Sequence, residues 1–296
     1  MGGLFVRKGI NIMIIKDEAL AELEREAHLF ATRKREAEVR QPLTLFVFDV
    51  EFSWDRNAHA GYVGAEGSSN EKGDPRWPFD RIAAASWLTL EFRPNSDLPE
   101  VMRPAVLTCE VLDERSIVSR LFDALETEPD AVVTTWGGEA RDFAVLRSAA
   151  ARHGLVLPAQ LREPSPFTPL RLDLRAATGV EAARVHLPEY CAGAGIPSKP
   201  SPSKSIGKLV EAECWDLVAD QVLADVLATS VVAIRHLAAH GRVTCDQPAA
   251  ILLLAEEALR ASPSSNFVTR TFKPWARAKH SASRLRGTVY RLPEAA

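Results

Sequence analysis

Asp49 and Glu51 lie two residues apart in an apolar stretch, residues 43–52, with the sequence Leu-Thr-Leu-Phe-Val-Phe-Asp-Val-Glu-Phe. The run of apolar and β-branched residues predicts a buried strand. Because side chains alternate along a strand, the two carboxylates are expected on the same face. Two neighbouring buried carboxylates are costly unless a cation lies between them, and a divalent metal ion suits their hard oxygen ligands. The alternative is a strand end that reaches solvent, where both acids face water.

Two further acids, Asp142 and Asp225, occupy places where a carboxylate needs an explanation. Asp142 follows a Gly-Gly turn and lies in the first turn of a predicted helix, where the helix dipole alone favours an acid. Asp225 lies in the middle of a strongly apolar helical segment, where a lone buried carboxylate would cost several kcal/mol. A metal ion shared with Asp49 and Glu51 would compensate that cost. A partner arginine or a backbone cap is the alternative.

The elements that must position these acids are predicted from the periodicity of the apolar residues. Strands are expected at residues 43–52, 81–92, 105–109, 131–136 and 170–174. Helices are expected at residues 17–39, 116–125, 142–153, 187–194, 215–239 and 248–260. Residues 53–78 contain four glycines and are expected to form a long loop. Three strands, followed by helices that alternate with two more strands, predict a mixed α/β fold with a five-stranded sheet flanked by helices.

The composition is that of a globular protein, with 46% hydrophobic and 25% charged residues in a chain of 296. No apolar run approaches the ~20 residues that span a bilayer. Arg7 and Lys8 are not followed by the apolar core of a signal peptide, and the four scattered cysteines form no disulfide or zinc pattern. We therefore expect a cytoplasmic protein without membrane contact. It would comprise a helical extension (1–40), a main domain (41–262) and a basic tail (263–296).

The charge is unevenly distributed, since residues 270–296 carry a net +6 and the rest of the chain carries −9. A basic tail of this kind is compatible with a nucleic-acid partner, and Lys273 and Arg277 are its predicted phosphate contacts. Lys199 and Lys204 bracket a Pro/Ser-rich connection and are predicted to meet phosphates in the same way. The alternative for the tail and for this connection is that they are solvated and contact no phosphate. Three aromatic residues interleave with the charges of the tail, where they could stack on bases or pack back onto the domain: Phe272, Trp275 and Tyr290.

Taken in order, these acids and their segments resemble the DEDD superfamily of 3′–5′ exonucleases. The resemblance is to bacterial proteins predicted to be exonucleases related to the proofreading domain of family B DNA polymerases. It extends over residues 43–241 and includes segments beyond the acids themselves. These segments are Pro78-Phe-Asp-Arg-Ile-Ala-Ala-Ala-Ser86, Val133-Thr-Thr-Trp-Gly-Gly-Glu-Ala-Arg-Asp-Phe-Ala-Val-Leu-Arg147, Arg171-Leu-Asp-Leu-Arg175 and Gly195-Ile-Pro-Ser-Lys199.

The resemblance implies a ribonuclease H-like fold and a phosphodiesterase that uses two Mg²⁺ or Mn²⁺ ions. Four residues match the metal-binding acids of the superfamily: Asp49, Glu51, Asp142 and Asp225. Two such ions about 4 Å apart can clamp an in-line phosphodiester displacement. The implied partner is a nucleic acid with a free 3′ end, with DNA favoured over RNA and the choice between them left open by the sequence. The sequence leaves the oligomeric state open.

Two positions depart from the superfamily pattern. Active members place a Tyr four residues, or a His five residues, before the last Asp, where it orients or deprotonates the attacking water. Here those positions hold Gln221 and Asp220, and a Gln can hold a water but cannot act as a base. Gly137 stands where the superfamily often has Asn. The alternative function is therefore a nucleic-acid-binding module that retains the exonuclease fold with weakened or no catalysis.

Overall fold

The structure is a computed structural model of the chain. It describes residues 20–22, 24–26, 28–29, 42–66, 76–163, 168–179, 185–202 and 205–285. The described residues between 20 and 29 are helical, in line with the helix expected there. Lys204 and Tyr290, which the sequence singled out, lie outside the described residues.

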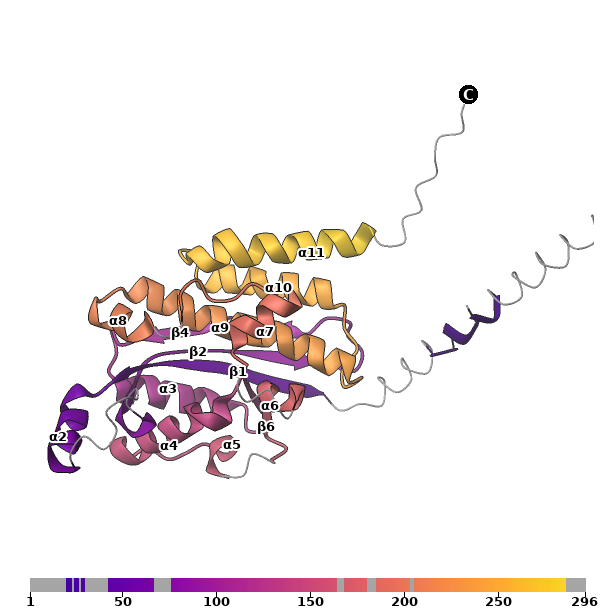
Figure 1. The fold of residues 1–296 in the computed structure, drawn as a ribbon. Coiled ribbons are helices and arrows are strands. Elements are labelled where there is room, and N and C mark those ends of the chain that lie inside the picture. Colours follow the sequence, from indigo (N-terminus) through magenta and orange to yellow (C-terminus); the bar gives the residue numbers. More distant parts are fainter. Residues whose placement is uncertain are drawn as a thin grey trace, which may run out of the picture.

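A mixed six-stranded sheet forms the centre of the fold (Figure 1). Its strands are β1 (Leu43–Trp54), β2 (Asp80–Phe92), β3 (Glu100–Val101), β4 (Ala105–Thr108), β5 (Val132–Thr135) and β6 (Arg171–Asp173). The order is β3-β2-β1-β5-β6, and β4 also pairs with β2. Strands β1 and β2 are antiparallel, whereas β5 is parallel to β1 and β6 is parallel to β5.

This sheet confirms the expected mixed α/β class, a sheet flanked by helices, with one difference in the number of strands. The five predicted strands are β1, β2, β4, β5 and β6. The additional strand β3 is two residues long and pairs with the end of β2 at Leu90 and Glu91. Because β4 pairs with an earlier part of β2, at Ala84–Trp87, the two short strands follow each other along the same edge.

Helices cover both faces of the sheet (Figure 1). They are α2 (Arg56–Glu66), α3 (Glu114–Thr127), α4 (Asp142–His153), α5 (Ala159–Arg162), α6 (Leu174–Thr178), α7 (Leu187–Ala194), α8 (Ile206–Glu211), α9 (Trp215–Ala239), α10 (Gln247–Ala261) and α11 (Lys273–Leu285). Short turns of 3₁₀-helix occur at η1 (Trp77–Phe79) and η2 (Gly138–Ala140), and a π-helical turn, η5 (Val268–Phe272), precedes α11. Helices α3 and α4 lie on one side of the sheet and α9 on the other, with α10 and α11 stacked outside α9.

The alternation of side chains along β1 divides the core in two. Phe46, Phe48 and Val50 pack on the side of α3 and α4, whereas Leu45 and Val47 pack on the side of α9. A two-residue period places residues 49 and 51 on the α9 side as well. The acids of β1 therefore face the long helix that carries Asp225.

The segment expected as a long loop, residues 53–78, is partly helical, so that prediction is wrong. Strand β1 extends to Trp54 and helix α2 follows at once, despite Gly61 and Gly64. Ring packing outweighs the weak helix propensity of glycine here. His59 lies 5.1 Å from Trp54 and 5.0 Å from Phe79, measured between ring centroids. These contacts hold α2 against the end of the sheet.

Helix α9 is long and apolar enough, by length and composition alone, to cross a membrane. This differs from the expectation that no segment approaches that length. The most apolar window of α9 is 89% buried inside the protein. Most of its surface contacts the sheet and neighbouring helices, as in the core helix of a soluble α/β domain.

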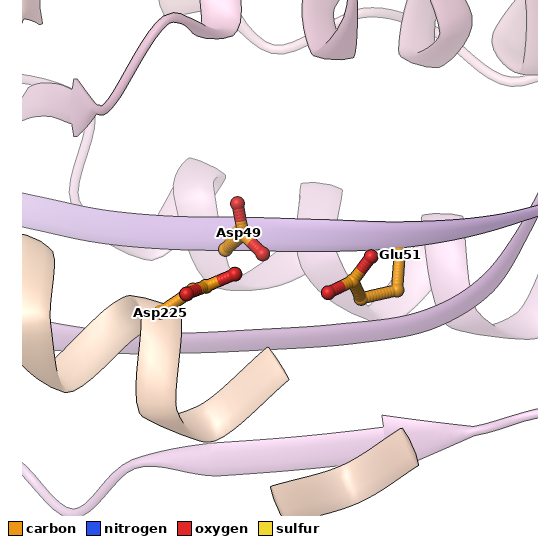
Figure 2. Close-up of side chains that lie close together, drawn as sticks. All are labelled: Asp49, Glu51 and Asp225. Carbon is orange, nitrogen blue, oxygen red and sulfur yellow. The ribbon is translucent and has the colours of Figure 1, made fainter. Parts of the chain in front are cut away.

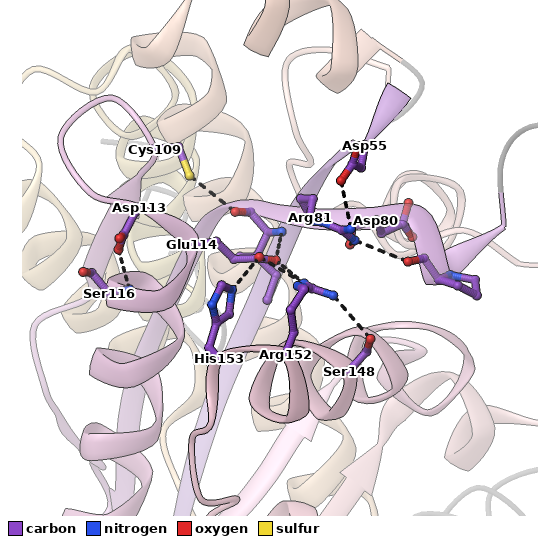
Figure 3. Close-up of polar contacts among 12 residues, drawn as sticks. Asp55, Asp80, Arg81, Cys109, Asp113, Glu114, Ser116, Ser148, Arg152 and His153 are labelled. Atoms are coloured by element: carbon purple, nitrogen blue, oxygen red, sulfur yellow. Dashed lines mark hydrogen bonds and ion pairs between the residues drawn. The ribbon is translucent and has the colours of Figure 1, made fainter. Parts of the chain in front are cut away.

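Glu114 joins three elements on the α3 and α4 side of the sheet (Figure 3). Its carboxylate accepts a hydrogen bond from the Ile82 backbone N–H at 2.9 Å and from Arg152 at 2.8 and 3.0 Å. The His153 Nε2 atom lies 2.8 Å from the second carboxylate oxygen. One acid thus connects β2, the start of α3 and the end of α4.

The basic segment after residue 263 contributes to the outer helical layer as far as it is described. Phe272 is fully buried, and Trp275 donates its indole N–H to the carbonyl of Gly195 at 3.1 Å. These two aromatics pack back onto the domain, which was one of the two alternatives for them. The domain boundaries themselves stay a prediction.

Candidate metal centre

Three carboxylates from β1 and α9 converge in the interior (Figure 2). Oxygen atoms of Asp49, Glu51 and Asp225 all lie within 4.8 Å of one another. Glu51 is 7% exposed and Asp225 4% exposed, while Asp49 is partly exposed. The strand period brings the first two acids to the same face, and the crossing of α9 over that face adds the third.

Lys199 supplies a positive charge to this cluster. Its ammonium nitrogen lies 2.5 Å from Asp225 Oδ2 and 3.6 Å from Glu51 Oε1, and its side chain is 8% exposed. The sequence placed Lys199 in a flexible connection and predicted a phosphate contact. In the structure the lysine lies between the carboxylates of Glu51 and Asp225. It is a basic partner for Asp225, where the alternative to a metal ion named an arginine or a backbone cap. Its contact with nucleic acid stays a prediction.

One ammonium group does not satisfy all the oxygens that surround it. Among the described residues, the buried side-chain atoms without a hydrogen-bond partner include Glu51 Oε1, Asp225 Oδ1 and both polar atoms of Gln221. Buried polar atoms are rarely left without a partner, because each one costs about 1–3 kcal/mol. Their concentration at one place indicates a site that is built to receive a further ligand.

The pKa values of the three acids also indicate a site that is built to receive a ligand. Burial raises the pKa of Glu51 to about 7, although Lys199 and the nearby amide of Gln221 lower it in part. Burial also raises the pKa of Asp225, again opposed by Lys199. For Asp49, burial and then the charges of Asp225 and Glu51 raise the pKa well above its usual value. A divalent cation would reverse these shifts, because it favours the ionised form of every carboxylate around it.

Asp142 lies beside the cluster rather than within it. It is the first residue of α4, and its carboxylate is not part of the group within 4.8 Å. Burial raises its pKa to about 8, with Arg141 opposing and Glu51 adding to the shift. Its charge also raises the pKa of Asp49. Asp142 is therefore close enough to interact electrostatically with both acids of β1, as a ligand of a second ion would.

Gln221 and Asp220 precede Asp225 by about one turn of α9, but their surroundings differ. Gln221 is fully buried and its amide lies near Glu51. The Asp220 carboxylate accepts hydrogen bonds from the backbone N–H groups of Asn266 and Phe267, at 3.1 and 3.2 Å. Asp220 thus caps the start of the segment that leads into α11. These two hydrogen bonds give Asp220 a structural role.

Lys273 and Arg277, the two predicted phosphate contacts of the basic tail, lie on α11, the helix labelled in Figure 1. Arg277 is exposed and Lys273 is partly exposed. Neither belongs to the carboxylate cluster. Their role as phosphate contacts stays a prediction.

The donor set fits a hard divalent cation. Asp49, Glu51 and Asp225 offer carboxylate oxygens at mutual distances that one ion can bridge, and Glu51 Oε1 and Asp225 Oδ1 accept no hydrogen bond. Mg²⁺ and Mn²⁺ prefer such ligands and usually retain waters. With Lys199 between Glu51 and Asp225, a metal ion would have to displace or share the place of its ammonium group.

Comparisons with known proteins do not assign the chain to a family. No family model matches, and no curated protein matches. Among solved structures, the family B DNA polymerase from the hyperthermophilic archaeon Pyrobaculum calidifontis matches with 17% identity and a TM-score of 0.46. The match covers 82% of this chain and 29% of the polymerase. At this distance the similarity does not specify an activity, so the residues of the site must carry the functional interpretation.

Proposed function

We propose that this protein is a metal-dependent 3′–5′ exonuclease of the DEDD type. The observation that carries the proposal is the buried cluster of Asp49, Glu51 and Asp225, whose oxygens lie within 4.8 Å of one another and are only partly satisfied. The ribonuclease H-like sheet and the position of Asp142 beside the cluster support it. The proposed substrate is a nucleic acid with a free 3′ end, DNA rather than RNA.

In this proposal the four acids would hold two Mg²⁺ or Mn²⁺ ions, which would supply a water of lowered pKa and positive charge for the departing 3′ oxygen. Two residues of the chain would hold a water and balance the charge of the substrate. Glu51 lies next to the amide of Gln221, which can hold a water by hydrogen bonds without taking its proton. The Lys199 ammonium group, already between two acids, can balance negative charge as substrate phosphate enters.

The alternative is a nucleic-acid-binding module with the same fold and weak or absent hydrolysis. Three observations favour it. Gln221 replaces the residue that orients or deprotonates the water, and Asp220 is engaged in capping the segment before α11. In addition, Lys199 occupies part of the space between Glu51 and Asp225.

A degradation assay tests the exonuclease proposal. The wild-type chain is incubated with single-stranded DNA and RNA labelled at the 5′ end, with Mg²⁺ or Mn²⁺, and the product ladder shows the polarity of cleavage. We expect stepwise shortening from the 3′ end, and a loss of at least about 10³-fold for Asp225→Asn, as for other essential catalytic groups. Asp216→Asn, an exposed acid on the same helix, is the matched control. A wild-type chain that degrades neither substrate with either metal would contradict the proposal.

Gln221→Tyr separates the two candidate functions. If the missing water-orienting group limits the rate, this variant should degrade the oligonucleotide about 10-fold faster or more, as expected for a positioned acid–base group. The larger ring must fit a fully buried site, so a thermal melt is needed to show that the variant folds. A folded Gln221→Tyr protein with unchanged rate would exclude that explanation for weak activity.

A further inference from the structure

The turn that leads into Asp142 carries an arginine from a different element. Gly137 has a left-handed backbone, with φ of 80°. A Cβ atom added to this glycine would lie 2.7 Å from Cζ of Arg175 and 2.9 Å from Nη1. The guanidinium group therefore lies directly on the glycine, in the space that any side chain at position 137 would fill.

Asp173 fixes this arrangement. Its Oδ1 atom accepts hydrogen bonds from the Gly137 N–H at 2.8 Å and from the Arg175 N–H at 3.0 Å. One carboxylate thus joins the turn after β5 to the first turn of α6. Because Asp142 begins the helix that follows this turn, Arg175 has a defined position relative to that acid. Its charge is close enough to lower the pKa of Asp142 in part, against the larger effect of burial.

Arg175 differs from the other arginines of this region in its contacts. Arg141 forms an ion pair with Asp80 at 2.6 Å, and Arg171 forms one with Glu139 at 2.8 Å. Within the described part of the chain, the Arg175 guanidinium group makes no ion pair and no side-chain hydrogen bond. The residue is partly exposed, and its charge acts on Asp142, the acid beside the cluster.

We infer that Arg175 binds a backbone phosphate of the nucleic-acid strand next to the metal centre, and that Gly137 is required to make room for it. A guanidinium group offers two parallel N–H donors that match the oxygens of a phosphate. Four carboxylates attract metal ions but repel a polyanion, so a cation near Asp142 with uncommitted donors would help to hold the strand. This inference rests on the proposed function, since it names how that site would hold its substrate.

Fluorescence anisotropy with a 5′-fluorescein-labelled oligodeoxythymidylate of 12 nucleotides tests the inference, with EDTA present to stop cleavage. We expect Arg175→Ala to bind about 10-fold more weakly, the usual loss for a charge-assisted hydrogen bond. The slope of log affinity against log salt should fall by about 0.7, the value for one phosphate of a single strand. Arg120→Ala, an exposed arginine on α3, is the matched control and should bind like wild type.

Two further measurements exclude a merely structural effect. Gly137→Ala should reproduce the loss of affinity, because its Cβ atom displaces the guanidinium group. An oligonucleotide with uncharged methylphosphonates at its 3′-terminal linkages should bind wild type and Arg175→Ala equally. If Arg175→Ala does not fold by circular dichroism, Arg175→Lys, which keeps the charge but loses the paired donors, should still bind more weakly than wild type.

The outcomes separate this inference from the proposed function. Wild-type affinity in a folded Arg175 variant would overturn the inference and leave the exonuclease proposal intact. Binding that depends on Arg175, without degradation under any divalent metal, would support the inference and contradict hydrolysis. A wild-type chain that binds no oligonucleotide would overturn both.

Discussion

Each face of the central sheet carries a cluster of charged side chains, built around Glu114 on one face and around three acids on the other. The two clusters differ in how completely their carboxylates are satisfied by hydrogen bonds and ion pairs. On the α3 and α4 side, Glu114 accepts hydrogen bonds from Ile82 and Arg152 and contacts His153 (Figure 3). Burial opposes its ionised form, yet these partners lower the pKa of Glu114. On the α9 side, one lysine serves several carboxylates, and burial raises the pKa of each of them.

The number of partners that each carboxylate has distinguishes an acid that stabilises the fold from acids that are available to bind a ligand. A buried carboxylate with several donors is already in its most stable state, and a further cation has no free oxygen to bind. Carboxylates that retain unpartnered oxygens and raised pKa values reduce the stability of the protein until a cation arrives. The same sheet therefore carries a structural cluster on one face and a binding cluster on the other.

Glu114→Ala should have the largest effect on stability. The change removes the acceptor for a backbone N–H and for two basic side chains, at a cost of about 3 kcal/mol in the free energy of unfolding. Urea denaturation followed by circular dichroism at pH 7 measures this value. Glu110→Ala, an exposed acid in the same region, should change it by less than about 0.5 kcal/mol. A Glu114 variant as stable as that control would remove the distinction between the clusters.

Lys199→Met should destabilise the metal-free protein by a smaller amount, about 2 kcal/mol at pH 8. Removing the ammonium group leaves Glu51 and Asp225 without their cation, although protonation of the acids limits the cost. Thermal melts in EDTA and in Mn²⁺ are the measurement. Mn²⁺ should stabilise the variant more than the wild type, because the metal takes the place of the ammonium group. Lys208→Met, an exposed lysine on α8, serves as control, and equal responses of the two variants to Mn²⁺ would refute the counter-ion role of Lys199.

The pH dependence of stability should have opposite signs for the two clusters. The folded-state pKa of Glu51 is raised to about 7, so the folded protein binds more protons than the unfolded chain above about pH 4.5. Its contribution to stability in EDTA is therefore lost as pH rises from about 4.5 to 7, by roughly 3 kcal/mol at most. Asp142, with a pKa of about 8, extends this loss to higher pH.

Glu114 acts in the other direction, since its pKa is lowered in the folded state. The stability it contributes is present above its usual pKa and is lost as pH falls through the folded value. Urea midpoints from pH 3 to 9 measure both effects. Glu51→Gln should flatten the decline at high pH, and Glu114→Gln should flatten the decline at low pH. If Glu51→Gln leaves the high-pH limb unchanged, the raised pKa of Glu51 is not its cause.

The sequence alone was sufficient where a periodic pattern determines the structure. A two-residue period predicted that Asp49 and Glu51 share a face, and the structure places both toward α9. The helical period of residues 215–239 predicted the core helix that carries Asp225, with the bounds that the structure has. Both patterns depend on local geometry that neighbouring residues repeat. The same local reasoning failed at α2, where ring contacts between distant residues override two glycines.

Only the tertiary structure decided which charged groups meet. Nothing in the sequence pairs Lys199 with Asp225, Asp220 with the backbone at Asn266, or Arg175 with Gly137. The residues of each pair belong to different elements, and their contact depends on how those elements cross. A periodic pattern specifies the face on which a side chain lies, but the partner it finds there is set by packing. For this protein, the sequence determined which acids could form a site, and the fold determined how far their charges are already neutralised.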